Sequence, residues 1–293
     1  MNPSVGVVIP TCGDRPGPLR AALAAVLAQE PAAVVVVADD CDPIDVAGQL
    51  GDLTRQVRVL PNRLTPGLPG ARNTGIAALG TDLVAFCDDD DLWLPGKLAA
   101  QLEALGDAEF ASCAIEVAYG SRRITRTAGK PEITLTDLVR SRMVMVHSST
   151  FLFRRGAYWV DESAPGGQNE DWDLALRAAK RRPIAHVDRP LVRVGWDGQR
   201  AVARWGERIA GLEWMLARHP ELAADQRGVA RIYGQLAFHH AALGRRREAA
   251  RWAVRAMAAR RSEPRAPIAL AVAAGLVPAR TVLSLLHTRG HGI

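Results

Sequence analysis

Residues 71–95 read ARNTGIAALGTDLVAFCDDDDLWLP and combine three features that decide the fold. A helix-like segment, Ala71–Leu79, precedes the short apolar run Leu83–Cys87, which lacks polar alternation. Apolar runs of this kind are typical of strands buried on both faces, as in parallel sheets. Four consecutive aspartates, Asp88–Asp91, follow directly. The stretch therefore predicts a helix, a buried strand and an acidic loop at the carboxyl end of that strand.

The same alternation of strand-like and helix-like segments extends over the first hundred residues. It predicts a mostly parallel sheet in a Rossmann-like α/β fold, with ligands at the carboxyl ends of the strands. Polar residues follow two further strands, at Thr11–Arg15 and at Asp39 and Asp40. The other strand-like runs are Val5–Ile9, Val34–Ala38 and Val57–Leu60, and the other helix-like segment is Leu19–Gln29.

The four aspartates predict a metal site. Adjacent carboxylates repel one another, and Asp is disfavoured in strands, so the run costs stability without a cation. Carboxylate oxygens suit Mg²⁺ or Mn²⁺. Alternate residues of an extended chain point the same way, which selects Asp88 and Asp90 as the metal ligands. The alternatives are an exposed acidic loop, or Asp91 acting as the N-cap of a following helix.

Three weaker signals lie elsewhere. Asp39 and Asp40 end a buried strand, where an aspartate can accept a hydrogen bond from a nucleoside, although Asp is also an ordinary turn residue. The Gly/Pro turn Gly67–Gly70 precedes a helix whose free N–H groups, with Arg72 beside them, suit a diphosphate. Glu170–Asp173 opens an amphipathic helix, where the helix dipole favours acids whatever the function.

The C-terminal third is predicted to be helical and is strongly basic. Residues 200–293 contain 16 Arg and 6 Asp or Glu, while the whole chain has a formal net charge of +6. Such a bias indicates nucleic acid, an anionic membrane or an acidic partner, or simply Arg-rich helix surfaces. No nucleic-acid motif accompanies it, so we predict no nucleic-acid partner and keep peripheral membrane contact through these helices as a hypothesis. Residues 230–261 resemble one tetratricopeptide-like helix pair, with Gly244 in the turn.

Composition limits the class of protein further. The 293 residues are 48% hydrophobic, enough for one large domain with a helical appendage. The four cysteines have no C-x-x-C spacing and are expected to be reduced thiols. The N-terminal apolar run is expected to be a first strand and not a signal peptide, and Ile268–Val277 is too short to cross a bilayer. We expect a cytoplasmic protein with one domain at 1–197 and a helical segment at 198–293.

The order of these motifs resembles that of the family 2 glycosyltransferases, which have the GT-A fold. The resemblance covers roughly residues 4–195. Two positions depart from the family pattern. Cys12-Gly13 stands where the family often has an aromatic residue followed by Asn, and Cys41-Asp42 stands where it often has Gly-Ser. The matching segments are VVIPTCGDR from Val7, VVVVADDCD from Val34, ARNTG from Ala71, the four aspartates, HSSTFLFRR from His147 and NEDWDLALR from Asn169.

The resemblance implies an inverting, metal-dependent transfer of a sugar from a nucleotide-diphosphate sugar to an acceptor hydroxyl. Asp171, in the E-D pair, would be the catalytic base, and Asp88 and Asp90 would hold Mg²⁺ or Mn²⁺ on the diphosphate. We expect a UDP or dTDP sugar as donor, a small-molecule, glycan or peptide acceptor, and a single non-processive transfer. The residues implied for donor binding are Pro10, Thr11, Arg15, Asp40, Arg72, Asn73, Asp88 and Asp89.

Two alternatives stay open at this point. A sugar-nucleotide pyrophosphorylase shares the α/β architecture and the metal, but it would carry a longer Gly-rich loop with a Lys after the first strand. A non-catalytic binding protein of the GT-A fold would lack an intact D-x-D motif or the base.

Overall fold

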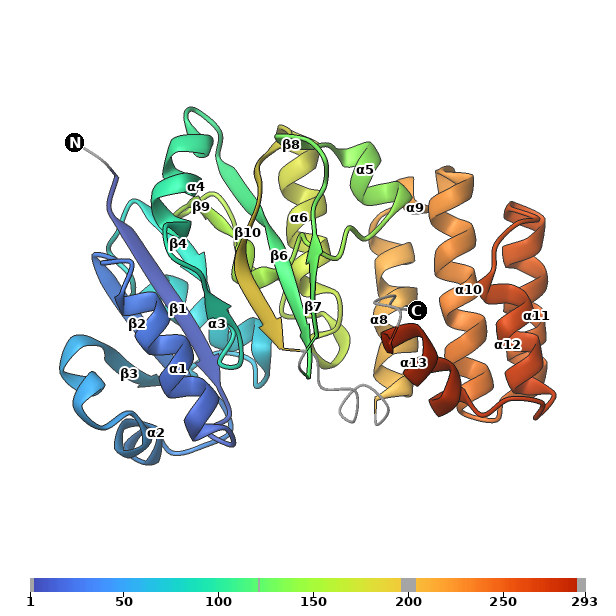
Figure 1. Ribbon diagram of the computed structural model, residues 1–293, viewed down its shortest axis with the longest axis horizontal. Helices are drawn as coiled ribbons and strands as arrows, with labels where there is room; N and C mark the ends of the chain where they lie inside the picture. Colours follow the sequence, from blue (N-terminus) through green and yellow to red (C-terminus); the bar gives the residue numbers. More distant parts are fainter. Residues whose placement is uncertain (1–2, 121, 196–203, 289–293) are drawn as a thin grey trace. The chain divides into compact units, whose positions relative to one another are not determined.

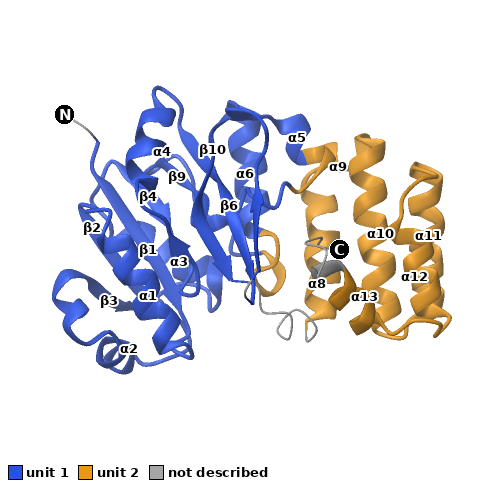
Figure 2. Cartoon of the chain, in the orientation of Figure 1, with its two compact units in different colours: residues 1–138, 143–163, 170–195 blue, residues 139–142, 164–169, 196–293 orange. Residues whose placement is uncertain are grey.

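The computed structural model describes residues 3–120, 122–195 and 204–288. The chain forms two compact units, which Figure 2 distinguishes by colour. The predicted domain boundary at residue 197 lies outside the described residues. Unit 2 also includes two short segments that precede residue 195 in the sequence. Unit 1 consists of residues 1–138, 143–163 and 170–195, and unit 2 of residues 139–142, 164–169 and 196–293.

Unit 1 is built on one sheet with the strand order β3-β2-β1-β4-β9-β6-β10-β5, while β7 pairs with β6 and β8 with β10 (Figure 1). The half β3-β2-β1-β4 is parallel throughout, as predicted. Beyond β4 the sheet is mixed, because β9 lies antiparallel between β4 and β6. The strands are β1 Val5–Thr11, β2 Ala33–Ala38, β3 Arg58–Pro61, β4 Leu83–Phe86, β5 Leu92–Trp93, β6 Phe110–Tyr119, β7 Arg122–Arg126, β8 Glu132–Ile133, β9 Leu152–Arg154 and β10 Ile184–Gly195.

Helices cover both faces of the parallel half. The chain moves outward from β1 to β3 and then returns to β4 on the other side of β1. Right-handed crossovers therefore place α1 and α2 on one face and α3 on the opposite face. The helices before residue 196 are α1 Pro16–Leu27, α2 Pro43–Leu50, α3 Leu68–Ala78, α4 Lys97–Leu105, α5 Leu135–Arg140 and α6 Glu170–Arg181, with 3₁₀ turns η1 Gly51–Gln56, η2 Ser148–Thr150 and η3 Pro165–Gly167.

The segment after the aspartates differs from the prediction in two respects. Asp91 is not a helix N-cap, because residues 92–93 form β5 against β10 and α4 begins at Lys97 behind a left-handed Gly96 (φ +79). The chain is also not extended at the aspartates, since β4 ends at Phe86 and the Asp91 N–H donates to the Asp88 carbonyl at 3.1 Å. Strand alternation therefore cannot place Asp88 and Asp90 on one side.

Gly75 explains why the ARNTG segment ends in glycine. It lies in α3 at the contact of this helix with β1, where a Cβ atom would overlap the side chain of Val8. Val8 is fully buried in β1, which lies between β2 and β4. The missing side chain therefore lets α3, which carries Arg72, pack directly on the sheet.

We expect Gly75→Ala to lower the free energy of unfolding by about 1–3 kcal/mol, because the new methyl group overpacks the buried α3–β1 contact. Urea denaturation measures this loss. Gly80→Ala is the matched control, since its added Cβ meets nothing within 4 Å. The control should change stability by less than about 0.5 kcal/mol. Equal losses in the two variants would contradict the tight contact.

The described part of unit 2 is helical. The pair expected at residues 230–261 corresponds to α10 and α11, joined by a turn with Gly244 at φ +72. Ala249, Ala253 and Ala256 are fully buried in its core, which allows the helices to approach closely. No helix among the described residues is long and apolar enough to span a membrane. The helices are α8 Trp205–Arg218, α9 Glu221–Ala224, α10 Gln226–Ala242, α11 Arg246–Ala259, α12 Arg265–Ala273 and α13 Ala279–Thr288.

Candidate active site

The sheet brings distant segments to one edge. Because β1, β2 and β4 are parallel, the polar residues that follow them share the carboxyl edge of the sheet. Strand β9 runs antiparallel to β4, with Leu152 opposite Ala85. The turn η2, just before β9, therefore lies beyond the end of β4, beside the aspartates. The site thus combines the ends of parallel strands with a turn that enters from the mixed half of the sheet.

Arg15 bridges two of the aspartates. Its guanidinium group forms ion pairs with Asp89 and Asp90. Asp89 is buried and also accepts a hydrogen bond from the Thr11 hydroxyl at 2.6 Å. The Asp90 side chain is 39% exposed, against 3% for Asp89. Asp90 is therefore the most exposed of the four aspartates, and its charge is balanced by Arg15 with a smaller contribution from His147.

Arg72 bridges a third aspartate and the start of α6. Its guanidinium group donates to Asp88 at 2.6 Å and to Glu170, and it lies over the Phe86 ring at 5.3 Å from the centroid. The side chain is only 1% exposed. Burial opposes its charge, but Asp88 and Glu170 outweigh burial and raise the pKa of Arg72, so it stays a cation. Both arms of this guanidinium are therefore used within the protein.

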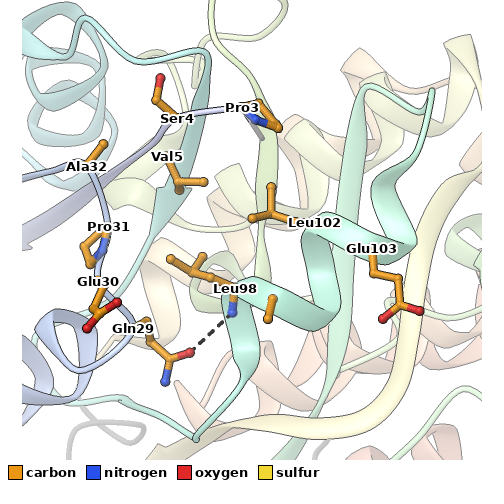
Figure 3. Close-up of a pocket in the computed structure, with 11 residues that line it drawn as sticks. Pro3, Ser4, Val5, Gln29, Glu30, Pro31, Ala32, Leu98, Leu102 and Glu103 are labelled. Atoms are coloured by element: carbon orange, nitrogen blue, oxygen red, sulfur yellow. Dashed lines mark hydrogen bonds between the residues drawn. The ribbon is translucent and has the colours of Figure 1, made fainter. Parts of the chain in front are cut away.

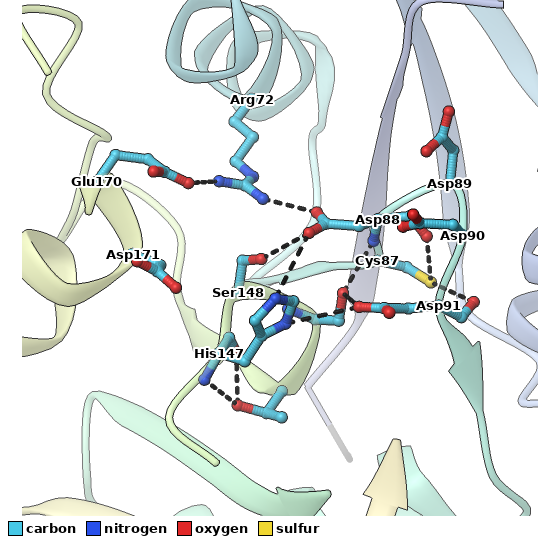
Figure 4. Close-up of polar contacts among 12 residues, drawn as sticks. Arg72, Cys87, Asp88, Asp89, Asp90, Asp91, His147, Ser148, Glu170 and Asp171 are labelled. Carbon is cyan, nitrogen blue, oxygen red and sulfur yellow. Dashed lines mark hydrogen bonds and ion pairs between the residues drawn. The ribbon is translucent and has the colours of Figure 1, made fainter. Parts of the chain in front are cut away.

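His147 lies between Asp88 and Asp91 in Figure 4. Its Nε2 is 3.9 Å from Asp88 Oδ2, and its Nδ1 is 3.5 Å from Asp91 Oδ2. The neighbouring hydroxyls fix both carboxylates, since Ser148 donates to Asp88 at 3.0 Å and Ser149 donates to Asp91 at 2.6 Å. One ligand atom from each of Asp88, Asp91 and His147 lies within 4.8 Å of the others, a spacing that suits a metal ion.

Burial and the excess of acids raise several pKa values at this edge. Burial raises the pKa of Asp89 to about 6 and that of Asp91 to about 7. Burial likewise raises the pKa of Glu170 to about 7. Asp88 behaves differently, because Arg72 and His147 outweigh its burial and lower its pKa. Acidic groups thus outnumber cationic groups at this edge, and this excess of negative charge favours the binding of a metal ion.

Asp171 enters the site from the first turn of α6. It lies on the same side of the site as Glu170 in Figure 4. The next residue, Trp172, is 1% exposed and donates its indole N–H to the Leu138 carbonyl at 3.1 Å, which fixes the start of the helix. The chain enters α6 through left-handed residues at Gly166, Gly167 and Asn169. The residue that follows Asp171 is therefore anchored in the core, and its N–H donates to the Asp171 carboxylate at 2.7 Å.

Other residues predicted to bind the donor have different surroundings. Pro10 is buried within β1, and Asp40 is exposed after β2 with φ +55. Asp39 is the buried member of that pair, and it accepts from the Gly67 N–H at 3.0 Å. The Asn73 amide contacts the backbone of Val160 and the Glu162 carboxylate. Asn73 therefore holds the 160–162 loop and does not join the acidic edge.

Sequence reasoning missed His147, Ser148 and Ser149 as site residues. Their segment, HSST, was noted only as part of the family pattern. A histidine followed by two small hydroxyl residues just before a buried strand is the signal that could have indicated them. The alternative of Asp91 as a helix N-cap is wrong, because Asp91 is one of the buried carboxylates of the site and α4 begins behind Gly96.

A cavity of about 550 Å³ lies elsewhere in unit 1 (Figure 3). It is at the amino ends of β1 and β2, opposite to the edge that carries the aspartates. Its polar groups include Gln29, whose side chain accepts from the Leu98 N–H at 3.4 Å. The convergent charged groups are at the other edge, which is the candidate active site. The lining residues are Pro3, Ser4, Val5, Gln29, Glu30, Pro31, Ala32, Leu98, Ala99, Leu102 and Glu103.

Comparison with known proteins identifies the family. Residues 6–160, just over half of the chain, match the model of glycosyl transferase family 2. The chain belongs to this family, and the predicted membership of the family is confirmed. The family assignment favours the transferase over the pyrophosphorylase alternative.

A curated relative is the succinoglycan biosynthesis protein ExoW of Rhizobium meliloti strain 1021, with 32% identity over 174 residues. The match covers 51% of this chain and 54% of that protein. The chain thus spans about half the length of this relative.

Solved structures confirm the predicted GT-A-like α/β fold with C-terminal helices. S. aureus TarS 1-349 in complex with UDP-GlcNAc is 14% identical with a TM-score of 0.61, covering 98% of this chain and 92% of that one. The mannosyltransferase PcManGT from Pyrobaculum calidifontis, in complex with GDP-Man and Mn²⁺, is 17% identical with a TM-score of 0.57, covering 98% and 85%.

Proposed function

We propose that this glycosyltransferase is metal-dependent and inverting, and that it moves a sugar from a nucleotide-diphosphate sugar to an acceptor hydroxyl in a single, non-processive transfer. The observation that supports this most is the charge imbalance at the carboxyl edge of the sheet. Among the described residues, the four aspartates and the Glu170-Asp171 pair meet there with Arg15, Arg72 and His147 as balancing groups. Such an edge has affinity for a divalent cation with a nucleoside diphosphate.

The residues of the edge fit a metal ion. Asp88 and Asp90 are the proposed ligands, since Asp90 is the exposed carboxylate. Asp88 with Asp91 and His147 is the second donor set, and its two aspartates are held by the hydroxyl groups of Ser148 and Ser149. When bound, a divalent cation stabilises the negative charge that develops on the departing diphosphate. Mg²⁺ and Mn²⁺ are the proposed ions, and PcManGT was solved with Mn²⁺.

Asp171 is the proposed catalytic base. It would accept the proton of the acceptor hydroxyl as the oxygen attacks the anomeric carbon from the face opposite to the diphosphate, which gives inversion. The neighbouring Glu170 is paired with buried Arg72 and so is less suited to meet the acceptor. In this proposal, Glu170 holds the start of α6 against α3 through its ion pair with Arg72, and Asp171 accepts the proton of the acceptor hydroxyl.

The proposed donor contacts come from the carboxyl end of β1 and from the loops after β1, β2 and β4. Thr11 and Asp40 would meet the nucleoside beside Pro10, and Asp89 would orient Thr11 and Arg15. A metal ion on Asp90 would free one arm of Arg15, which could then pair with a phosphate oxygen. For Arg72 and Asn73 we propose positioning roles in place of donor contact, because their polar atoms are engaged by Glu170, Asp88 and the 160–162 loop.

The remaining substrates follow from chemistry and from the relatives. A UDP or dTDP sugar is the proposed donor, and a TarS structure holds UDP-GlcNAc. Among small-molecule, glycan and peptide acceptors, the description of ExoW as a succinoglycan biosynthesis protein favours a glycan. The basic helices of unit 2 are the proposed point of peripheral contact with an anionic membrane.

We expect UDP with Mn²⁺ to raise the melting temperature by about 5 °C or more at 100 times Kd, because the ligand binds only the folded state. Differential scanning fluorimetry measures the shift. UDP in EDTA should give a much smaller shift, and Mn²⁺ alone should give a small one. The absence of a shift with UDP, dTDP or GDP in the presence of Mn²⁺ or Mg²⁺ would refute the proposal.

A further inference from the structure

Lys97 is a buried lysine that the proposed reaction does not use. It is the first residue of α4 and is 0% exposed. Its ammonium group lies over the Trp93 ring, 3.8 Å from the centroid, and donates to Gln101 Oε1 at 2.6 Å. Among the described residues, no carboxylate pairs with it, and burial lowers the pKa of Lys97 to about 8. Burying a cation without an acidic partner costs stability, so its two contacts need a reason.

Lys97 determines the orientation of the Gln101 amide. An ammonium group only donates hydrogen bonds, so it must face the amide oxygen, Oε1. The amide nitrogen, Nε2, is then turned toward the Thr150 carbonyl and donates to it at 2.6 Å. The reversed amide would place N–H donors against the ammonium group and an oxygen against a carbonyl. Because Gln101 is itself 0% exposed, solvent does not compete for either contact.

Trp93 supplies a second donor to the same turn. Its indole N–H donates to the Ser149 carbonyl at 3.2 Å, while the face of its ring carries the Lys97 ammonium group. We call Trp93, Lys97 and Gln101 the η2 support. The support comes from β5 and α4, and it holds the carbonyl groups of two consecutive residues of η2, Ser149 and Thr150.

The turn held in this way carries the hydroxyl groups that fix the aspartates. The Ser149 hydroxyl donates to Asp91 at 2.6 Å and accepts from the Asp88 N–H at 2.9 Å. The Ser148 hydroxyl donates to Asp88 at 3.0 Å. The carbonyl of Ser149 thus contacts the support while its hydroxyl contacts the site. A displacement of the turn would therefore move both hydroxyl groups, and the adjoining His147, relative to the aspartates.

The simpler interpretation is that the support only fills the core beneath α4. Buried carbonyl groups need donors whatever the function, and Gln101 and Trp93 meet that need. The lysine is not explained in this way, because apolar side chains of similar volume fill a core without the cost of desolvating a charge. Its contacts with both donors indicate that their orientation matters.

We propose that the η2 support consists of positioning residues for the metal and donor site, which hold the η2 turn in place against Asp88 and Asp91 before a ligand binds. The inference rests on the proposed metal-dependent function and deepens it. The support acts through the turn and does not itself contact a substrate. Groups that orient metal ligands from the outer shell typically contribute about 10–100-fold to metal affinity or activity.

Gln101→Glu is the test variant. Glu has the shape of Gln and gives Lys97 a carboxylate partner, so the fold should persist. Its second oxygen would face the Thr150 carbonyl, however, where an N–H group now donates. We expect the affinity for UDP in the presence of Mn²⁺, measured by calorimetric titration, to fall by about 10-fold or more. The affinity for UDP in EDTA should change little.

Two other variants complete the set. Trp93→Phe keeps a ring beneath Lys97 and removes the N–H donor, so it should also weaken UDP binding in Mn²⁺. It provides a second test if Gln101→Glu fails to fold. Tyr158→Phe is the matched control, because it removes the hydroxyl with which a buried side chain of unit 1 donates to Glu109 at 3.1 Å. This control should bind UDP with Mn²⁺ as the wild type does.

Amide hydrogen exchange of the unliganded protein tests the support independently of the metal. The Thr150 N–H donates to the His147 carbonyl at 2.8 Å, and the Phe151 N–H donates to the Ser148 carbonyl at 2.9 Å. Both amides therefore report whether the turn stays closed. Their exchange should be faster in Gln101→Glu and unchanged in Tyr158→Phe.

The outcomes separate this inference from the proposed function. Unchanged exchange in Gln101→Glu, or faster exchange with normal UDP affinity in Mn²⁺, would overturn the positioning role. If the wild type itself shows no Mn²⁺-dependent binding of UDP, the proposed metal dependence fails. The exchange measurement then still decides whether the support holds the turn, so the two failures are distinguishable.

Discussion

Replacing Asp171 by Asn is expected to abolish sugar transfer while leaving donor binding intact. Asn has the same shape as Asp but cannot take a proton, and loss of a general base typically costs 10²–10⁴-fold in rate. The start of α6 should persist, because Trp172 anchors it through the Leu138 carbonyl. We therefore expect kcat to fall by about 10³-fold, with little change in the melting-temperature shift caused by UDP and Mn²⁺.

The measurement is the steady-state rate of sugar transfer to an acceptor, together with the UDP-induced shift of the same preparation. Asp173→Asn is the matched control, since Asp173 shares the first turn of α6 but is fully buried and pairs with Arg177 at 2.8 Å. This control should lose stability and retain kcat within a few-fold. A normal kcat in Asp171→Asn would assign the base elsewhere.

Glu170 is the alternative base, because its pKa, raised by burial to about 7, suits proton transfer near neutral pH. Its ion pair with Arg72 argues for a structural role. Glu170→Gln should therefore lower the melting temperature and weaken donor binding, since Arg72 would lose a partner. If Glu170→Gln keeps its melting temperature and its donor affinity and loses only kcat, Glu170 is the base.

The parallel half of the fold was predictable because its signals are local. Each strand is a short apolar run, and each is followed by polar residues that must meet at one edge once the strands are parallel. Thr11, Arg15, Asp88 and Asp89 do meet at that edge. The family pattern then indicated Asp171, which the helix dipole alone could not distinguish from an ordinary first-turn acid.

The contribution of His147 depends on a pairing that no local pattern encodes. It reaches the aspartates only because β9 inserts antiparallel beside β4, and the contact of Ser149 with Asp91 spans 58 residues. Short apolar runs do not reveal the direction in which their strand will pair. For the same reason, the neighbouring sequence does not reveal that Asp91 accepts from the Ser149 hydroxyl, and so it suggests a helix cap.

The roles of Arg72 and Asn73 were obscured for a related reason. Both follow a Gly/Pro turn at a helix start, a local pattern that favours phosphate binding. Their partners lie far along the chain, with Glu170 98 residues from Arg72 and Glu162 89 residues from Asn73. The position of Arg72 as a buried cation between Asp88 and Glu170 depends on tertiary structure. Because of it, we propose a positioning role for Arg72 in place of contact with the donor.

Asp88→Asn is expected to remove the metal-dependent part of donor binding, because Asp88 belongs to both proposed ligand sets. Calorimetric titration of UDP in Mn²⁺ and in EDTA measures this part. We expect the affinity for UDP in the presence of Mn²⁺ to fall by about 100-fold or more. Loss of an outer-shell partner of a metal ligand typically costs about 10–100-fold, and loss of a direct ligand should cost more. Asp107→Asn, at an exposed carboxylate between α4 and β6, is the control and should bind UDP normally.

Asp90→Asn and His147→Gln then distinguish the two ligand sets. If Asp88 and Asp90 hold the metal, Asp90→Asn should lose the Mn²⁺ dependence and His147→Gln should keep it. Arg15 forms an ion pair with Asp90 and so would compete with a cation for this carboxylate. Arg15→Gln should therefore bind Mn²⁺ more tightly without nucleotide, yet bind UDP with Mn²⁺ more weakly, because the released guanidinium no longer meets the diphosphate. Loss of the Mn²⁺ dependence in His147→Gln but not in Asp90→Asn would instead place the metal among Asp88, Asp91 and His147.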